Sequence, residues 1–333
     1  MKIAFFEIEN WEQEYLEKEL AGHELSFFPE PLGKENMNAA EQAEAVSIFI
    51  DSQLHKDMLE KLPNLKLIAV RATGFDNVDV KTATDHGIAV CNVPTYGENT
   101  VAEHTFGLIL NLSRKIYKSI QKVKEHGFRP DGLQGFDLKG KTLGIVGMGH
   151  IGQHVARIAQ GFEMNVLVSD AKEDKKLAKK LNITYTSLEN LLANSDIITL
   201  HVPLNEHTKH LINLSNIHQV KRGAYIINTA RGGIIETAAL VQALENGTVA
   251  GAGLDVLEEE HFIQEERELL TKGFSEKHDV KTLLENHILM ERDDVIITPH
   301  NAFNSKEALE RILQTTIENI KGFLSKELIN IVK

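Results

Sequence analysis

The amino-acid sequence predicts an α/β protein with two doubly wound domains, each built on a parallel sheet. Apolar runs rich in β-branched residues alternate with helix-forming stretches along the whole chain. This alternation is typical of parallel sheets that are covered by helices. The chain has 333 residues, which is long for one domain and comfortable for two. We therefore expect two consecutive series of strands and helices.

The first series of expected strands lies in the N-terminal part of the chain and reads "KIAFFEI", "LSFF", "VSIFI", "LKLIAV" and "IAVCNV". A proline-free stretch with apolar residues at helical spacing follows, from Glu98 to about Lys124. This spacing predicts one helix that is long enough to bridge two domains.

The second series of expected strands reads "TLGIVGMG", "NVLVSD", "DIITLHVP", "AYIINTA", "VAGAGLDV" and "VIITPH". The charged segment 258–294, between the last two strands, is interpreted as an excursion from the sheet. A terminal helix is expected from about Ser305 to Leu328, and one plausible layout packs it back on the first domain. The predicted domains are residues 1–98 together with 300–333, and residues 99–299.

Composition and charge narrow the class of protein. Hydrophobic residues make up 42% and charged residues 25%, as in ordinary soluble proteins, and no apolar run reaches the roughly 18 residues of a membrane helix. The N-terminus turns acidic too early for a secretory signal. The single cysteine, Cys91, fits a reducing compartment, and we expect the cytoplasm. A net charge of −12 argues against nucleic-acid binding and means that an anionic substrate needs a local cationic pocket.

A glycine-rich turn predicts where a dinucleotide binds. Gly147, Gly149 and Gly152 have G-x-G-x-x-G spacing, after the strand "LGIV" and before a helical stretch. The first glycine permits a tight turn, the second lets the backbone approach a pyrophosphate at the helix N-terminus, and the third lets helix and strand pack closely. Asp170 ends the next strand, 18 residues after Gly152. A carboxylate there binds the ribose hydroxyls and repels a 2′-phosphate, so NAD is favoured over NADP.

The histidines near this turn do not predict a metal site. His150 and His154 have the i, i+4 spacing of a metal-binding pair. However, His150 lies within the phosphate turn, and neither a cysteine cluster nor an HExxH pattern accompanies it. We expect no metal. His207 and His210, in "NEHTKH", are expected to be solvated.

Three ionisable residues follow strands of the second series, where ligands of doubly wound sheets bind. Arg231 follows "AYIINTA", Glu260 comes shortly after "VAGAGLDV", and His300 follows "VIITP". Each alone has a structural interpretation, as an ion pair, part of an acidic run or a hydrogen-bonded surface residue. Together with a nicotinamide they could reduce a 2-oxo acid. The histidine donates a proton, the carboxylate favours the charged imidazolium, and the arginine binds the substrate carboxylate with two hydrogen bonds.

The chain resembles the D-isomer-specific 2-hydroxyacid dehydrogenases over essentially its whole length. The motifs that carry the resemblance are "RATGFDNVD" (71–79), "NVPTYGENTVAEH" (92–104), "GMGHIG" (147–152), "LHVPLNEHT" (200–208), "INTARGG" (227–233), "GLDVLEEE" (253–260) and "TPHNAF" (298–303). The resemblance implies a flavodoxin-like substrate domain and a Rossmann-like NAD domain, with the active site in the cleft between them. It also implies a homodimer, to which the long helix near Asn99 contributes.

The resemblance assigns roles to the three strand-end residues. Arg231 matches the substrate-binding arginine and His300 the acid–base residue. Glu260 matches the carboxylate partner, because the family's glutamate stands five positions after the aspartate that corresponds to Asp255. The formate-oxidising branch has glutamine at this position. The family usually continues with proline soon afterwards, whereas this chain continues with "HF".

The same resemblance implies further residues around NAD and the substrate. Those at the cofactor are His150 and Ile151 at the phosphates, Asp170 at the ribose, Val202, Pro203 and Thr208 along the adenosine, and Thr229, Ala230, Arg231 and Asp255 near the nicotinamide. In the first domain, backbone amides around Thr73 and Gly74 would help to hold the substrate carboxylate.

The identity of the 2-oxo acid depends on two aromatic residues. Tyr96, in "VPTY", resembles the D-lactate dehydrogenase branch, and Phe303 fits a wall against a methyl group, although both could be packing aromatics. The prediction is reduction of pyruvate to D-lactate, with hydroxypyruvate, glyoxylate or a bulkier acid as alternatives. A phosphorylated substrate would need more basic residues than Arg71, which alone occurs in the matched substrate loops. A non-catalytic NAD-sensing module is the alternative of another class.

Overall fold

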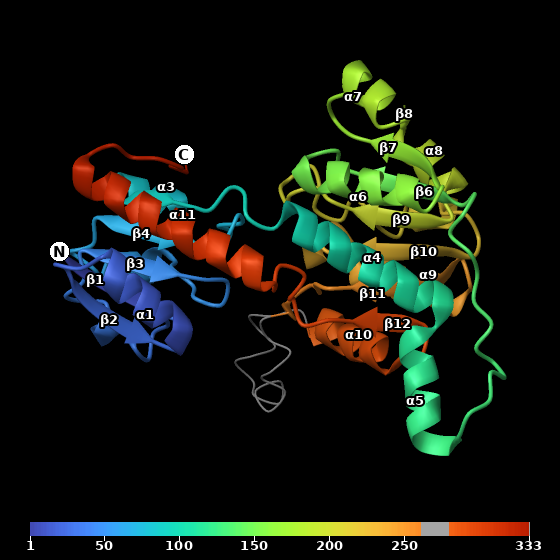
Figure 1. The fold of residues 1–333 in the computed structure, drawn as a ribbon, viewed down its shortest axis with the longest axis horizontal. Coiled ribbons are helices and arrows are strands. Elements are labelled where there is room, and N and C mark those ends of the chain that lie inside the picture. Colours follow the sequence, from blue (N-terminus) through green and yellow to red (C-terminus); the bar gives the residue numbers. More distant parts are fainter. Residues whose placement is uncertain (261–279, 333) are drawn as a thin grey trace. The chain divides into compact units, whose positions relative to one another are not determined.

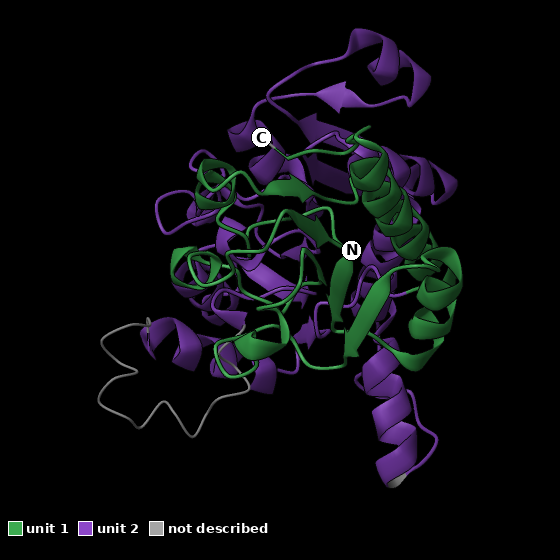
Figure 2. Cartoon of the chain, turned by 90° about the vertical axis from the view of Figure 1, so that its left-hand side faces the viewer, with its two compact units in different colours: residues 1–96, 305–333 green, residues 97–304 purple. Residues whose placement is uncertain are grey.

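The computed structural model describes residues 1–260 and 280–332 of the chain (Figure 1). The chain forms two compact units, which Figure 2 distinguishes by colour: unit 1 is Met1–Tyr96 with Ser305–Lys333, and unit 2 is Gly97–Asn304. Unit 2 ends a few residues after the boundary expected from the sequence. The backbone N–H of His300 donates to the carbonyl of Asp255, 2.9 Å away, which ties this segment to unit 2. No helix in the described ranges is long and apolar enough to cross a membrane.

Unit 1 is built on a five-stranded parallel sheet with the strand order β2-β1-β3-β4-β5. Its strands are β1 (Lys2–Phe6), β2 (Glu24–Phe28), β3 (Ala45–Ile48), β4 (Leu67–Val70) and β5 (Ala89–Cys91). Its helices are α1 (Asn10–Glu19), α2 (Lys56–Leu59), α3 (Val80–Asp85) and α11 (Lys306–Ser325), with a 3-10 turn η1 (Met37–Ala39). Each strand overlaps one of the five apolar runs from which it was predicted, and β2 and β3 begin one residue before their runs.

The C-terminal helix α11 completes the core of unit 1. Leu313, Ile317 and Ile320 are buried in one cluster with side chains of β1 and β4. The hydroxyl of Ser305 caps the helix by accepting the backbone N–H of Ala308, 3.2 Å away. The helix ends at Ser325 because Lys326 adopts the left-handed conformation, with φ of 63°.

Unit 2 is built on a seven-stranded parallel sheet with the strand order β12-β11-β10-β9-β6-β7-β8 (Figure 1). Its strands are β6 (Thr142–Val146), β7 (Asn165–Ser169), β8 (Thr184–Tyr185), β9 (Ile197–Leu200), β10 (Ala224–Asn228), β11 (Val249–Leu254) and β12 (Val295–Ile297). Its helices are α4 (Glu98–Arg114), α5 (Ile116–His126), α6 (His150–Gly161), α7 (Lys175–Lys180), α8 (Leu188–Asn194), α9 (Thr237–Glu245) and α10 (Val280–Glu291), with 3-10 turns η2 (Ile217–Gln219) and η3 (Gly232–Ile234). The two parallel sheets confirm the predicted fold class, although the two-residue strand β8 was not predicted.

The single helix predicted from Glu98 to Lys124 is wrong. The chain forms α4 and α5, which are separated at Lys115, where φ is 51°, and Figure 1 shows α5 running in a different direction from α4. Helix α4 packs against α6 and β11, whereas the apolar side chains of α5 are largely exposed, including Tyr117 at 57% and Val123 at 52%. The packing that keeps α4 straight therefore does not extend to α5.

The only cysteine of the chain lies inside unit 1. Cys91 ends β5 and is completely buried. Burial raises the pKa of its thiol to about 11, because the charged thiolate loses its water shell. The thiol is therefore a small apolar core group rather than a reactive one.

Candidate active site

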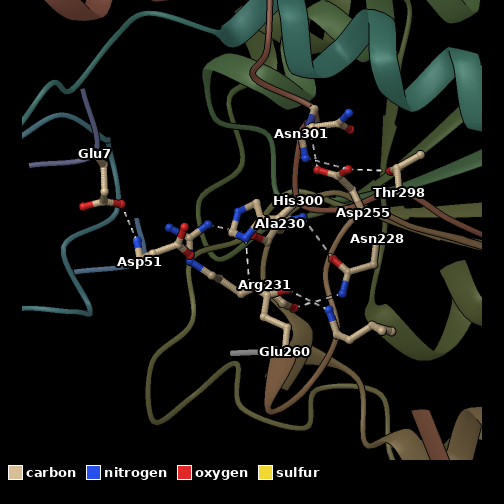
Figure 3. Close-up of polar contacts among 12 residues, drawn as sticks. Glu7, Asp51, Asn228, Ala230, Arg231, Asp255, Glu260, Thr298, His300 and Asn301 are labelled. Atoms are coloured by element: carbon tan, nitrogen blue, oxygen red, sulfur yellow. Dashed lines mark hydrogen bonds and ion pairs between the residues drawn. The ribbon is translucent and has the colours of Figure 1, made fainter. Parts of the chain in front are cut away.

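The residues predicted to form the site follow strands of one parallel sheet. All strands of a parallel sheet end at the same edge, and ligands of doubly wound sheets bind there. The glycine turn follows β6 and Asp170 follows β7, whereas Arg231, Glu260 and His300 follow β10, β11 and β12. Because β10, β11 and β12 are neighbours in the sheet, the structure brings these last three residues together, as Figure 3 shows.

His300 and Glu260 form a direct pair within unit 2. Nδ1 of His300 lies 2.7 Å from Oε1 of Glu260, and the two side chains are 26% and 21% exposed (Figure 3). The second carboxylate oxygen of Glu260 accepts the backbone N–H of Leu257, 3.0 Å away. A carboxylate on Nδ1 places the proton of the neutral ring there, and Nε2 is then the nitrogen that can face a substrate. The two residues after Glu260, where the family usually has proline, lie outside the described residues.

Asp255 holds the segment that carries His300. Its carboxylate is 1% exposed and accepts the hydroxyl of Thr298 at 2.5 Å and the backbone N–H groups of Asn301 and Ala302 at 3.0 and 2.8 Å (Figure 3). This support matters because His300 adopts a left-handed conformation, with φ of 48°, which costs a residue with a side chain about 1 kcal/mol or more. These contacts of Asp255 are structural, and its predicted place at the nicotinamide stays a prediction.

Arg231 is held by a short turn after β10. Asn228, itself 1% exposed, donates to the carbonyl of Arg231 at 2.9 Å and accepts the N–H of Ala230 at 3.0 Å (Figure 3). Nη1 of the guanidinium donates to the carbonyl of Ala230 at 2.8 Å. A side chain at Gly232 would collide with the backbone of Leu257, so the turn of Arg231 lies directly on the segment that leads to Glu260.

The glycine turn has the shape that a pyrophosphate needs. A Cβ at Gly147, whose φ is 95°, would collide with the carbonyl of His201, and a Cβ at Gly152 would collide with the carbonyl of Gly147. In contrast, Gly149 borders open space and begins α6 without a side-chain cap. The first amides of the helix therefore face an open approach, and these residues fit a dinucleotide.

Asp170 lies beside this turn. One carboxylate oxygen accepts the backbone N–H of Met148 at 2.6 Å, and the other accepts the N–H of Lys172 at 2.8 Å. A carboxylate has about four lone-pair positions, so these two contacts leave acceptor capacity for ribose hydroxyls. The contact with Met148 fixes the carboxylate next to the phosphate turn.

The other predicted cofactor residues surround the same sheet edge. Val202 and Pro203 follow β9, and the hydroxyl of Thr208 donates to the carbonyl of Pro203 at 2.5 Å. The hydroxyl of Thr229 lies 3.0 Å from that of Thr105, which α4 contributes and which is buried. His150 and Ile151 open helix α6. Their contacts with NAD stay predictions.

The predicted substrate residues belong to both units. Thr73, Gly74 and Tyr96 lie in unit 1, and Phe303 lies in unit 2. The hydroxyl of Thr73 donates to the carbonyl of Val93 at 2.9 Å, which fixes the turn after β4. Their roles in substrate binding stay predictions.

Arg71 is not available to a phosphorylated substrate. Its side chain is 1% exposed and donates to the carbonyls of Phe6 and Glu7 at 2.8 and 2.5 Å and to the hydroxyl of Ser47 at 3.2 Å. It therefore joins β1, β3 and β4 inside unit 1. The role of Arg71 is therefore structural.

His210, which was expected to be solvated, is only partly so: its side chain is 36% exposed. Its Nε2 lies 2.6 Å from Oε1 of Glu258, which is only 14% exposed. Sequence reasoning missed this pair because its members are 48 positions apart and Glu258 stands in a run of three glutamates. In the described residues, including His150 and His154, no cluster of three or more His, Cys, Asp or Glu side chains could hold a metal ion.

Comparison with known proteins relates this geometry to a family. Residues 106–302 match the NAD binding domain of the D-isomer specific 2-hydroxyacid dehydrogenases. The chain is 40% identical to 2-hydroxyacid dehydrogenase homolog 1 of Schizosaccharomyces pombe, over 98% of this chain and 97% of that protein. It is 36% identical to the D-lactate dehydrogenase of Escherichia coli, over 97% and 96% of the two chains.

A solved structure agrees with both units. The D-lactate dehydrogenase of Aquifex aeolicus, complexed with NAD and lactic acid, superposes with a TM-score of 0.86 and 35% identity, over 98% of this chain and 96% of that one. The matched domain makes NAD the cofactor of this chain, as predicted from the glycine turn. The chain belongs to the D-isomer specific 2-hydroxyacid dehydrogenase family, and it is an oxidoreductase that acts on a CH–OH group.

Proposed function

We propose that this enzyme reduces pyruvate to D-lactate with NADH, using Arg231, Glu260 and His300. The observation that carries the proposal is the 2.7 Å contact between His300 and Glu260. Arg231 lies next to this pair, and the glycine turn belongs to the same sheet. The D-lactate dehydrogenases among its relatives support the choice of substrate.

The three side chains divide the work of the reduction. NADH supplies the hydride that adds to the carbonyl carbon. Arg231 binds the substrate carboxylate through two parallel hydrogen bonds and polarises the carbonyl. His300 transfers a proton from Nε2 to the carbonyl oxygen as that oxygen becomes a hydroxyl, and water later reprotonates the ring. Glu260 holds the ring through Nδ1 and stabilises its charged form.

The cofactor preference follows from Asp170. Its carboxylate is fixed beside the phosphate turn by the N–H of Met148. A 2′-phosphate at this position would meet a like charge, whereas ribose hydroxyls would donate to it. We therefore expect NADH to be used in preference to NADPH.

The substrate preference depends on Tyr96 and Phe303, which suit a small side chain. Hydroxypyruvate, glyoxylate and bulkier 2-oxo acids are the alternatives, since the same catalytic set serves them all. A phosphorylated substrate is disfavoured, because the guanidinium of Arg71 already donates to three acceptors inside unit 1.

We also propose a homodimer in the cytoplasm. The exposed apolar side chains of α5, among them Ile116, Tyr117 and Val123, support an interface near the junction of α4 and α5. The one cysteine, which is buried, suits a reducing compartment. Sedimentation of the purified protein would measure the oligomeric state, and a monomer at micromolar concentration would contradict the dimer.

The experiment that tests the function is NADH consumption against a panel of 2-oxo acids, repeated with NADPH. The panel contains pyruvate, 2-oxobutyrate, hydroxypyruvate, glyoxylate, phenylpyruvate and a branched oxo acid. We expect the highest kcat/KM with pyruvate and NADH, and D-lactate as the product in a chiral assay. A higher kcat/KM with a bulky acid would discard the lactate assignment and keep the mechanism.

A further inference from the structure

Glu258 connects four segments of unit 2. One carboxylate oxygen lies 2.6 Å from Nε2 of His210. The other accepts the backbone N–H and the hydroxyl of Thr237, at 2.9 and 2.6 Å, at the start of α9. Its own carbonyl accepts the side-chain amide of Asn286, in α10, at 2.7 Å. A carboxylate with this many donors is fixed in place, and its negative charge also suits the helix N-terminus.

The segment that Glu258 fixes is the one that presents Glu260. Glu259 adopts the left-handed conformation, with φ of 54°, so the chain turns sharply between the two glutamates. The N–H of Leu257 then donates to the carboxylate of Glu260 at 3.0 Å, and the other oxygen of that carboxylate pairs with His300. A shift of the backbone at Leu257 would therefore move the partner of the catalytic histidine.

The same segment also supports the arginine. A Cβ at Gly232 would collide with the carbonyl group of Leu257 and the backbone nitrogen of Glu258, so the two backbones are in direct contact. Arg231 precedes Gly232, so the position of its backbone depends on this contact. The anchored segment thus lies between the group that binds the carboxylate and the pair that moves the proton.

We propose that Glu258, together with His210, is a positioning residue for the reaction: it sets the geometry of Glu260 against both His300 and Arg231. The proposal rests on the proposed roles of these three residues. Glu258 takes no proton from the substrate, because each of its carboxylate oxygens already has a donor within unit 2. Loss of its side chain should impair chemistry and binding of the oxo acid more than binding of NADH, because the glycine turn and Asp170 follow β6 and β7, on the other side of β9 from β10 and β11.

The test compares Glu258→Ala, Glu258→Gln and the control Glu259→Ala, whose parent side chain is exposed. For Glu258→Ala we expect kcat to fall roughly tenfold and KM for the oxo acid to rise, because misplacement of catalytic groups by a fraction of an ångström has effects of this order. The dissociation constant of NADH should change less than either kinetic constant. The pH at which the reduction rate is half lost should decrease, because Glu260 then stabilises the imidazolium less well.

Glu258→Gln should recover most of kcat, since its amide oxygen still accepts from Thr237, and Glu259→Ala should resemble the wild type.

Two results would overturn the positioning role. One is a Glu258→Ala protein with lowered thermal stability but wild-type kcat, KM and pH profile. The other is a Glu259→Ala protein with the same defects as Glu258→Ala. If Glu258→Ala does not fold, His210→Ala replaces it. We expect the same changes in kcat, KM and pH profile at a smaller magnitude. An unchanged pH profile in this variant would contradict the positioning role.

An NMR titration separates this proposal from the proposed function. The imidazole signals of His300, assigned by their loss in His300→Gln, report its contact with Glu260 without turnover. Wild-type protein that reduces no oxo acid would refute the proposed function alone. An unchanged His300 titration in Glu258→Ala would refute the positioning role, whether or not the enzyme turns over.

Discussion

Arg71 in unit 1 and Arg231 in unit 2 occupy equivalent places in sequence and differ in structure. Each follows an apolar strand of a parallel sheet, β4 or β10. The guanidinium of Arg71 is buried and donates to two carbonyls and a hydroxyl from β1 and β3 or next to them. Arg231 is partly exposed and lies beside Glu260 and His300 (Figure 3).

The difference shows that position after a strand does not by itself indicate a ligand site. What matters is whether the neighbouring strands supply acceptors that match the cation. The acceptors of Arg71 come from residues up to 65 positions away, so the pattern around it in the sequence contains no sign of them. A buried arginine without such acceptors would be very costly.

The strongest test of this comparison is the same substitution at both sites, beginning with Arg231→Met. We expect kcat/KM for the oxo acid to fall by ~10³-fold, because the substrate carboxylate loses its charged partner. Thermal stability should remain near that of the wild type. Steady-state kinetics and a melting curve measure both, and a large loss of stability with modest kinetic change would reverse the assignment.

His300→Gln tests the proposed proton donor of the same site. We expect the rate of oxo-acid reduction to fall by ~10²-fold or more, the scale of lost general acid catalysis, with NADH binding intact. Stopped-flow reduction at saturating NADH measures the chemical step. Near-normal turnover in this variant would exclude His300 as the proton donor.

Arg71→Met is the matched change in unit 1. We expect the free energy of unfolding to decrease by about 3 kcal/mol, since loss of the guanidinium leaves its buried acceptors unsatisfied and removes the positive charge near the buried Glu12. Activity per folded molecule should remain within a few-fold of the wild type. Urea unfolding compared with Arg157→Met, which changes an exposed arginine, isolates the effect of burial. Wild-type stability would mean that the hydrogen bonds of Arg71 contribute little.

His201 extends the comparison to histidines. Burial lowers the pKa of His201 to about 3, its Nε2 lies 2.9 Å from the hydroxyl of Thr199, and its Nδ1 has no hydrogen-bond partner. In the unfolded chain His201 binds a proton near pH 6.5, whereas in the folded chain it stays neutral at that pH. The free energy of unfolding therefore decreases as the pH falls below 6.5. Between pH 7 and pH 5 we expect His201 to account for about 2 kcal/mol of this loss. His201→Gln should remove that part of the pH dependence in urea unfolding, and an unchanged slope would contradict it.

The sequence predicted well what depends on local pattern. Strands were found because burial on both faces demands continuous apolar runs, and the glycine turn was found because Gly147 and Gly152 meet backbone that leaves no room for a Cβ. Because parallel strands share one edge, the order of strands then placed Arg231, Glu260 and His300 on one side of the sheet.

The parts that could not be predicted depend on distant contacts. Lys115 breaks the helix although lysine is a good helix former, and α4 packs on α6 and β11 whereas the apolar side chains of α5 are largely exposed. The pair of His210 with Glu258 exists only once the chain has folded. Glutamate is ordinarily a surface residue, so nothing in the run "EEE" distinguishes Glu258 as a buried partner.

The buried thiol of Cys91 can report how often unit 1 opens. With a pKa of about 11, only about one molecule in 10⁴ carries a thiolate at pH 7, and full burial blocks reagents in the closed state. Since the chain has a single cysteine, labelling by a thiol reagent counts openings around β5 and nothing else. The rate of labelling of Cys91 with and without NADH would therefore measure whether a nucleotide held by unit 2 changes how often unit 1 opens. This measurement needs no engineered probe.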